Sequence, residues 1–274
     1  MYNNKIGTIR KLSKILDEGT DKIKDLGLET IQLSCWEPEL YTQETADKLK
    51  SMLGDSLEIT SVWAGWTGGP RNWNFIDGPY TLGIVPEAYR ARRLQEIIEG
   101  AKFAKMLGVK EVATHVGFIP EQPASELYRV VMRSIRYLAE ELDKMGLNFN
   151  FETGQETPVT LMRMITDVDM PNVGINLDPA NLIMYGKGNP VDALDLFKGK
   201  IRGVHIKDGD YPTDFYALGA ERVVGEGTVN FDVFLPKLLK QGYTGDLYIE
   251  REISGDQQIA DIKKTIAYVK ELMK

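Results

Sequence analysis

The stretch MGLNFNFETGQETPVTLMRMITDVDMPNVGINLD, residues 145–178, contains one complete strand–helix–strand unit. Its first strand, Asn148–Glu152, follows Gly146, a residue type that favours the left-handed cap at a helix end. A helical pattern then opens at Pro158, where a missing backbone N–H costs nothing, and a second apolar run covers Val173–Leu177. Because two strands joined through a helix need a crossover connection, we predict that they are parallel.

The same unit recurs along the chain. The predicted strands are Asn4–Ile9, Thr30–Ser34, Glu58–Trp63, Glu111–His115, Asn148–Glu152, Val173–Leu177, Gly203–Ile206 and Leu247–Glu250. The predicted helices are Ile9–Leu26, Thr42–Leu53, Pro86–Leu107, Ser125–Met145, Pro158–Val168, Pro190–Phe197, Phe231–Lys240 and Ile259–Met273. Eight such units favour an α/β fold of one closed (β/α)8 TIM barrel, which takes about 250 residues. We therefore expect a single TIM-barrel domain over residues 1–274, without the Gly-x-Gly-x-x-Gly turn of a dinucleotide-binding sheet.

Composition narrows the class of protein. The net charge of −7 argues against nucleic acid as a partner, because binding a phosphate backbone needs a basic face. Cys35 is the one cysteine, so no intrachain disulfide can form. The first residues lack the apolar stretch of a signal peptide, and no apolar run approaches the roughly 20 residues that span a bilayer. We predict a cytoplasmic protein with no membrane partner.

Four successive strands end in a side chain that can bind a metal ion. The residues are Glu152, Asp178, His205 and Glu250. In a closed barrel the carboxyl ends of the strands surround one central point, so these side chains should converge there. Three oxygen ligands and one imidazole suit a hard or borderline divalent ion such as Mn²⁺, Mg²⁺ or Co²⁺.

Each of these residues also has a plainer interpretation when it is taken alone. A glutamate after a strand is often a helix-start carboxylate, and His205 could be a hydrogen-bonded core histidine. Asp178, directly before Pro179, could be a turn residue. Their equivalent places on consecutive strands favour the metal site.

These strand ends resemble those of the sugar isomerase/epimerase branch of the xylose isomerase-like barrels. The motifs that carry the resemblance are Phe-Glu152-Thr, Asn-Leu-Asp178-Pro-Ala-Asn181, His205-Ile-Lys-Asp208, Val-Gly225-Glu226-Gly227-Thr and Tyr-Ile-Glu250. The branch includes ketose 3-epimerases, hydroxypyruvate isomerases and inosose-processing enzymes. The resemblance implies that the four residues hold one divalent ion, Mn²⁺ ahead of Mg²⁺, Co²⁺ or Zn²⁺. It also implies that Glu152 and Glu250 are catalytic and move a substrate proton through an enediolate.

The resemblance leaves two reactions open. The first is isomerisation or epimerisation of a ketose or keto-polyol; the alternative is a lyase or dehydratase acting on an inosose or a 3-keto-sugar. Ketose 3-epimerases carry a histidine where this chain has Asn181, and an arginine near the place of Tyr211. Their substrate-binding glutamate lies six residues after the first metal ligand, whereas the nearest candidate here is Glu156. Because of these departures from the ketose 3-epimerase pattern, the lyase or dehydratase alternative stays open.

Further residues are predicted to surround the metal ion. The candidates for binding the substrate are His115, Asn181, Lys207, Glu156, Trp36 and Trp66, and Glu226 is expected to orient His205 from behind. The other interpretations are core packing for His115, a salt bridge for Lys207, and loop anchoring or a subunit interface for the tryptophans. The expected partner is a small-molecule sugar, in a homodimer or homotetramer as is common among related barrels.

Overall fold

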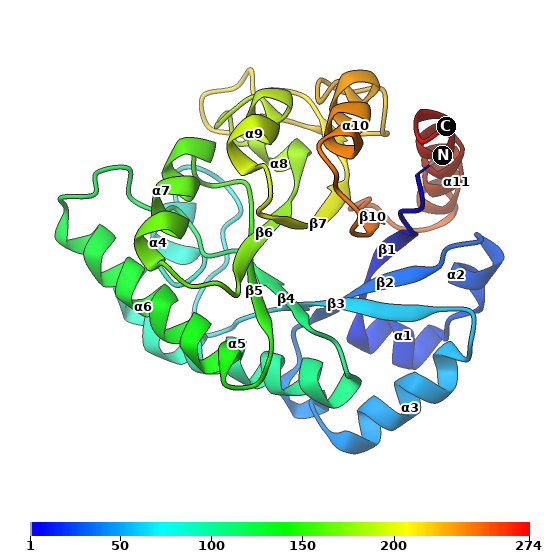
Figure 1. Ribbon diagram of the computed structural model, residues 1–274, viewed down its shortest axis with the longest axis horizontal. Coiled ribbons are helices and arrows are strands. Elements are labelled where there is room, and N and C mark those ends of the chain that lie inside the picture. The colour runs from blue at the N-terminus through cyan, green and yellow to red at the C-terminus, as the bar shows by residue number, and fades with distance from the viewer. Residues whose placement is uncertain (1) are drawn as a thin grey trace.

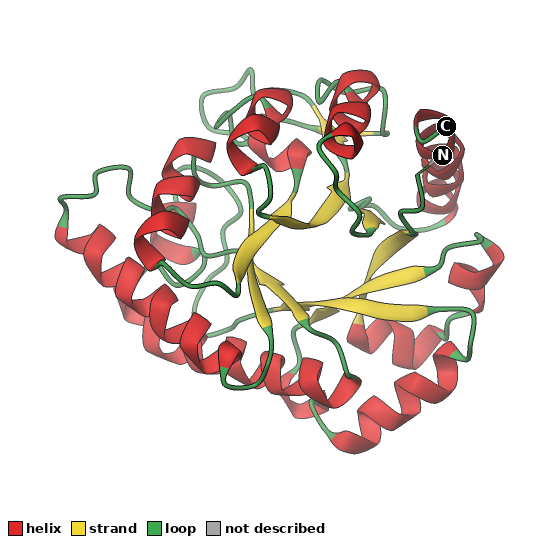
Figure 2. Cartoon of the chain, in the orientation of Figure 1, coloured by secondary structure: helices red, strands yellow, loops and turns green. Residues whose placement is uncertain are grey.

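The computed structural model describes residues 2–274 and is a closed barrel of eight parallel strands, in the order β1-β10-β7-β6-β5-β4-β3-β2. Figures 1 and 2 show the ring of strands with helices outside it. The barrel strands are β1 Ile6–Lys11, β2 Thr30–Cys35, β3 Glu58–Ala64, β4 Glu111–Thr114, β5 Asn148–Glu152, β6 Val173–Leu177, β7 Ile201–Ile206 and β10 Leu247–Ile249. The predicted TIM barrel is confirmed.

Helices connect the strands and form the outer layer. They are α1 Leu12–Glu18, α2 Asp21–Asp25, η1 Pro38–Leu40, α3 Gln43–Leu53, α4 Gly78–Thr81, α5 Glu87–Leu107, α6 Glu126–Asp143, α7 Pro158–Val168, α8 Pro179–Met184, α9 Pro190–Phe197, α10 Phe231–Lys240 and α11 Asp256–Leu272. A short antiparallel ribbon of β8 Asp208–Gly209 and β9 Glu221–Arg222 follows β7. Over residues 2–274, no helix has both the length and the apolar character to cross a membrane.

The beginning of the chain differs from the sequence prediction. The helix predicted over Ile9–Leu26 is two short helices, because Gly19 adopts a φ of 80° and breaks the turn between them. The first strand begins later than predicted. Asn4 lies before the strand, and its side-chain amide donates to the carbonyls of Tyr243 and Gly245, 3.2 and 2.7 Å away, in the loop between α10 and β10.

Glycines in the strands make room for polar side chains inside the barrel. A Cβ on Gly203 would lie 2.4 Å from Oδ1 of Asn176, and one on Gly174 would lie 2.6 Å from Oδ1 of Asn150. Both asparagines are buried, and Asn176 is adjacent to Glu152 in the register of β5 and β6. The barrel therefore holds a layer of amides directly beneath the strand ends that carry the candidate ligands.

Candidate metal centre

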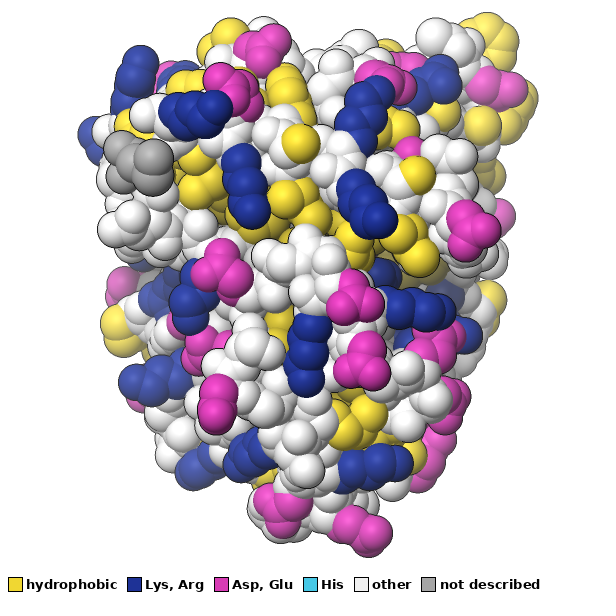
Figure 3. Space-filling view, turned by 90° about the vertical axis from the view of Figure 1, so that its right-hand side faces the viewer, with side chains coloured by type: hydrophobic (Ala, Val, Ile, Leu, Met, Phe, Trp, Pro, Cys, Tyr) yellow, Lys and Arg dark blue, Asp and Glu magenta, His cyan; other side chains and the backbone are white. Residues whose placement is uncertain are grey.

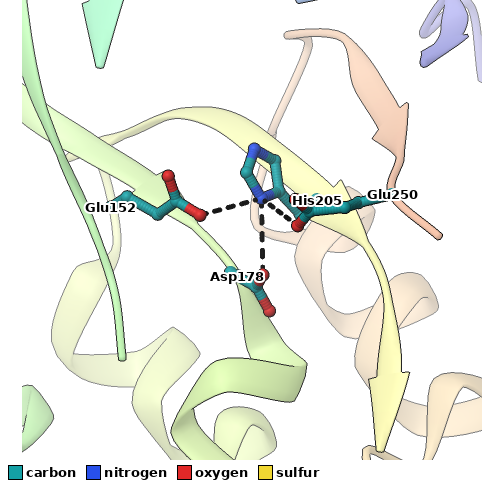
Figure 4. A group of neighbouring side chains, drawn as sticks. All are labelled: Glu152, Asp178, His205 and Glu250. Carbon is teal, nitrogen blue, oxygen red and sulfur yellow. Dashed lines mark hydrogen bonds and ion pairs between the residues drawn. The ribbon is translucent and has the colours of Figure 1, made fainter. Parts of the chain in front are cut away.

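The four predicted ligands come together at the carboxyl ends of β5, β6, β7 and β10. One ligand atom from each of Glu152, Asp178, His205 and Glu250 lies within 4.8 Å of the others. Figure 4 shows the three carboxylates arranged around the imidazole. Nδ1 of His205 is 3.3 Å from Glu152 Oε1, 3.4 Å from Asp178 Oδ2 and 3.2 Å from Glu250 Oε2.

The far nitrogen of His205 decides which ring atom faces the carboxylates. Nε2 lies 2.7 Å from Oε1 of Gln32, which accepts when Nε2 is protonated, and 2.8 Å from Nδ2 of Asn176, which donates when it is not. When Nε2 carries the one ring proton, the lone pair of Nδ1 points at the three carboxylates. The Gln32 amide group in turn donates to Ser61 Oγ at 3.0 Å and to Asn176 Oδ1 at 3.1 Å.

Gln32, and not Glu226, contacts the far nitrogen of His205. The sequence prediction that Glu226 orients His205 is therefore wrong. The Glu226 side chain is 52% exposed and pairs with Lys264 on α11. The Glu226 side chain points away from His205 because the backbone beside it is held by Asp208, which accepts from the N–H groups of Gly225 and Gly227 at 3.0 and 3.1 Å. The Gly-Glu-Gly turn therefore wraps Asp208 with its backbone and directs the glutamate outward.

The charges in the centre favour a cation. Burial acts to raise the pKa of the Glu152 carboxyl, but His115 and His205 outweigh it and hold that pKa below its usual value. Burial likewise opposes ionisation of Asp178 and Glu250, but Lys207 and His205 keep the pKa of both below the usual range. The centre therefore presents ionised carboxylates at neutral pH.

The carboxylates of the centre also act on the His205 imidazole. Burial lowers the pKa of His205, but Glu152 and Glu250 outweigh it and raise that pKa well above its usual value. The carboxylates thus stabilise a positive charge at the position of the Nδ1 proton, which a divalent ion can replace. Three carboxylate oxygens and one oriented imidazole nitrogen are a donor set that fits such an ion.

Lys207 is the nearest fixed cation. Its side chain is 2% exposed, and Nζ lies 3.2 Å from Glu250 Oε2, 3.2 Å from Glu252 Oε1 and 3.7 Å from Asp178 Oδ2. Burial opposes its charge, but Glu250 and Glu252 raise the pKa of the ammonium well above the usual value. Lys207 therefore stays charged and holds Glu250 in place.

A cavity of about 880 Å³ adjoins the centre, and Glu152 and Glu250 form part of its wall. Four of the predicted substrate-binding residues, His115, Asn181, Lys207 and Trp36, also line it. His115 Nε2 lies 3.4 Å from Glu152 Oε1, and its Nδ1 has no partner among the described residues. These side chains are placed to contact a ligand.

Two predicted substrate-binding residues lie outside the cavity wall. Trp66 is fully buried, its Nε1 donates to Thr114 Oγ1 at 3.2 Å, and it does not line the cavity. Trp63 and Trp73 line the cavity instead, and Trp63 donates its indole N–H to Glu152. Sequence spacing placed the tryptophans on the right loops but could not tell which ring faces inward.

Glu156 is the other residue outside the wall. Its side chain is buried, and Oε1 has no hydrogen-bond partner within residues 2–274. Burial raises the pKa of this carboxyl to about 8, so it is protonated at neutral pH. Gln155, which the sequence prediction missed, is also buried with both amide atoms unpartnered in the described structure. Both are buried polar side chains that do not line the cavity.

Comparisons with known proteins agree with this architecture. A family model described as "Xylose isomerase-like TIM barrel" matches residues 20–272. The crystal structure of a xylose isomerase domain protein from Planctomyces limnophilus is 31% identical, with a TM-score of 0.87 over 99% of this chain and 96% of that one. A D-tagatose 3-epimerase-like protein is 22% identical, with a TM-score of 0.77 over 98% of this chain and 97% of that one, and shows likeness of fold.

A curated relative has no assigned activity. An uncharacterized protein of Methanocaldococcus jannaschii is 28% identical over 194 residues. The match covers 66% of this chain and 61% of that protein's length.

Proposed function

The chain belongs to the xylose isomerase-like TIM barrel family, and we propose that it is a divalent-metal-dependent sugar isomerase or epimerase. The observation that carries the proposal is the position of two ionised glutamates. Glu152 and Glu250 reach the same imidazole from two sides and both line the cavity. Two carboxylates on either side of one site suit removal of a proton from one face or carbon of a substrate and its return at another.

The chain's own residues supply the proton transfer. When bound, a divalent ion would make the C–H beside a carbonyl more acidic by drawing negative charge onto the oxygens. One glutamate takes the proton as a carboxylate and can return it to the adjacent carbon; return at the opposite face comes from the other glutamate after it has taken up a proton from solvent. The Trp63 indole N–H and His115 orient Glu152, while Lys207 donates to Glu250 Oε2 at 3.2 Å.

The cavity wall supports a sugar as the ligand. Trp36 and Trp63 offer aromatic faces, with ring centroids 4.9 Å apart, and His115 and Asn181 offer hydrogen-bonding groups. Lys207 can stabilise negative charge that develops on a substrate oxygen. Manganese as the ion, the homodimer or homotetramer, and the cytoplasmic location remain predictions.

The test is incubation of the Mn²⁺-loaded protein with ketoses, inososes and 3-keto-glycosides in D₂O. We expect one substrate to gain deuterium at carbon while the product keeps the substrate's elemental composition, as mass spectrometry and NMR would show. Loss of water or of an aglycone would identify the lyase alternative. Absence of deuterium incorporation and of any product across the panel would overturn the proposed function.

A further inference from the structure

The cavity beside the metal centre continues to the outside of the barrel. Its wall runs from Glu152 and Glu250 past the end of β1 and the loop after β10 to apolar side chains on or beside α1, α2 and α11. We call the part lined by Ile15, Ile23, Leu26 and Ile259 the outer groove. The whole volume of about 880 Å³ lies in the upper part of the range of about 300–1,000 Å³ that holds drug-sized ligands. The space therefore suits a ligand larger than one sugar ring.

The outer groove has an apolar floor and a cationic rim. Figure 3 faces α1, α2 and α11, and shows hydrophobic side chains in a hollow with Lys and Arg side chains around it. Four cations of the cavity wall, Arg10, Lys11, Lys14 and Lys22, lie on or beside α1 and α2. This group of cations contrasts with the chain's net charge of −7.

Neighbouring acids neutralise only part of this rim. Lys14 pairs with Glu18 at 3.1 Å, and Asp256 lies on the α11 side of the cavity wall. Arg251 is committed elsewhere, to Glu221 and Asp261, both at 2.8 Å. Arg10, Lys11 and Lys22 make no ion pair within the part of the chain that the structure describes.

Arg10 is the member of this rim that most needs a ligand. Its side chain is half-buried, and burial lowers the pKa of the guanidinium while Glu18 partly offsets this effect. The residue makes no ion pair or side-chain hydrogen bond with any residue in the range 2–274. A guanidinium remains charged at neutral pH, and a desolvated one is stabilised by an anion that accepts its N–H groups.

We propose that the outer groove binds an apolar extension of the substrate that carries an anionic group, a phosphate or a carboxylate. The alkyl or aryl part packs on Ile15, Ile23 and Ile259, and the anion accepts hydrogen bonds from Arg10. This proposal rests on the proposed function, in which the other end of the substrate is a sugar that reacts at Glu152 and Glu250. It adds a substrate class, a sugar linked to an amphipathic anion.

Calorimetric titration of the chelator-treated full chain tests the groove separately from the metal centre. The probes are hexyl phosphate and hexanoate, with hexan-1-ol and inorganic phosphate as controls for the apolar and anionic parts. We expect hexyl phosphate, hexanoate or both to bind saturably, with one probe molecule per protein chain, and the probe that binds more tightly identifies the anion. Hexan-1-ol and inorganic phosphate should bind at least about tenfold more weakly.

Variants locate the binding. Arg10→Gln should weaken binding of the anionic probe at least about tenfold. Lys22→Glu, at an exposed position, should also weaken this binding and should leave folding unaffected. Lys105→Gln, an exposed change on α5, is the matched control and should leave binding unchanged. Absence of saturable binding, equal binding of hexan-1-ol, or unchanged affinity in both groove variants would overturn the proposal.

The deuterium assay then tests the link to the substrate. Arg10→Gln should raise KM for an anionic member of the active sugar class and leave kcat and the KM of a neutral member unchanged. An equal effect on both would contradict a subsite for the anion. If the proposed function is wrong but the outer groove binds an anion, deuterium exchange will be absent while the groove still binds the hexyl probes.

Discussion

His205 connects the metal ligands to the barrel interior through its two ring nitrogens. Nδ1 faces three carboxylates, and Nε2 is held 2.7 Å from Gln32 Oε1. We predict that Gln32→Leu weakens Mn²⁺ affinity by about 10- to 100-fold, because the imidazole loses the acceptor that fixes its tautomer and orientation. Ser61→Ala is the matched control, since it removes a neighbouring bond of the same amide but spares His205. Equal Mn²⁺ affinity in Gln32→Leu and the wild type would contradict this role.

The proton-transfer roles predict the behaviour of two conservative variants. Glu152→Gln and Glu250→Gln should each lower the rate of deuterium exchange by about 10²- to 10⁴-fold, because an amide cannot take up the substrate proton. Their thermal unfolding should stay cooperative. Glu226→Gln, at the half-exposed residue paired with Lys264, should keep the wild-type rate. Wild-type exchange rates in either site variant would rule out the assigned role.

Glu156 makes stability depend on pH. Burial raises the pKa of its carboxyl from 4.5 to about 8, so the folded protein retains a proton that the unfolded chain releases. This contribution is fully present below pH 4.5 and is lost as the pH rises to about 8, at up to about 1.4 kcal/mol per pH unit.

Glu156→Gln removes this dependence because an amide resembles the protonated carboxyl. The variant should match the wild type near pH 5 and exceed its free energy of unfolding by an increasing margin up to pH 8, as measured by urea unfolding. A constant difference between the two proteins across that range would contradict the raised pKa.

At the scale of residues, the meeting of the four candidate ligands was predictable because a barrel brings the ends of consecutive strands together. The residues around them were not, since sequence does not show which face a loop side chain presents. Trp66 turned away from the cavity to reach Thr114, and the Gly225–Gly227 turn used its backbone rather than Glu226. Gln32 did leave a signal, as a polar residue between Ile31 and Leu33 in a predicted strand.

At the scale of elements, Arg93 on α5 holds the long loop after β3. The guanidinium is fully buried and donates to the carbonyls of Thr67, Thr81 and Gly83 at 3.0, 2.7 and 2.7 Å. It also stacks 4.3 Å from the ring centroid of Trp66. Burial lowers the pKa of Arg93 to about 10, so it is still charged at neutral pH.

This arrangement predicts a loop that depends on one side chain. Arg93→Met should lower the free energy of unfolding by about 3 kcal/mol, because several buried carbonyls lose their donor, and should speed proteolysis within residues 67–83. Arg92→Met is the control, because Arg92 is exposed and its pair with Glu96 should contribute less than about 1 kcal/mol. Equal stability of the two variants would show that Arg93 does not hold the loop.

The elements of the chain were predictable to different degrees. β5, β6, α7 and α9 have the predicted bounds, because glycine and proline mark where they begin and end. The first helix could not be divided from periodicity, since apolar spacing continues across the break at Gly19. Short elements such as α8 and the ribbon of β8 and β9 depend on tertiary contacts, including the Asp208 carboxylate that accepts from the 225–229 backbone.

For the whole molecule, closure of the barrel is what creates the site. Gln32 and Glu250 are distant in sequence, yet both approach His205, because β2 and β10 each lie next to β1 in the ring. The cavity beside the centre then joins it to the outer groove between the first and last helices. An ion at the centre would join residues from β5, β6, β7 and the end of β10, and would bind the folded state alone.

The most direct test is a Mn²⁺ titration of the chelator-treated chain, with free Mn²⁺ followed by electron paramagnetic resonance. We predict one ion per chain and at least about tenfold weaker binding in Asp178→Asn, which removes a ligand charge and can keep the helix cap to Asn181. Affinity should also rise with pH, because the proton held on His205 by Glu152 and Glu250 must leave. The absence of stoichiometric Mn²⁺ binding, or unchanged binding in Asp178→Asn and His205→Asn, would contradict a metal centre at these four residues.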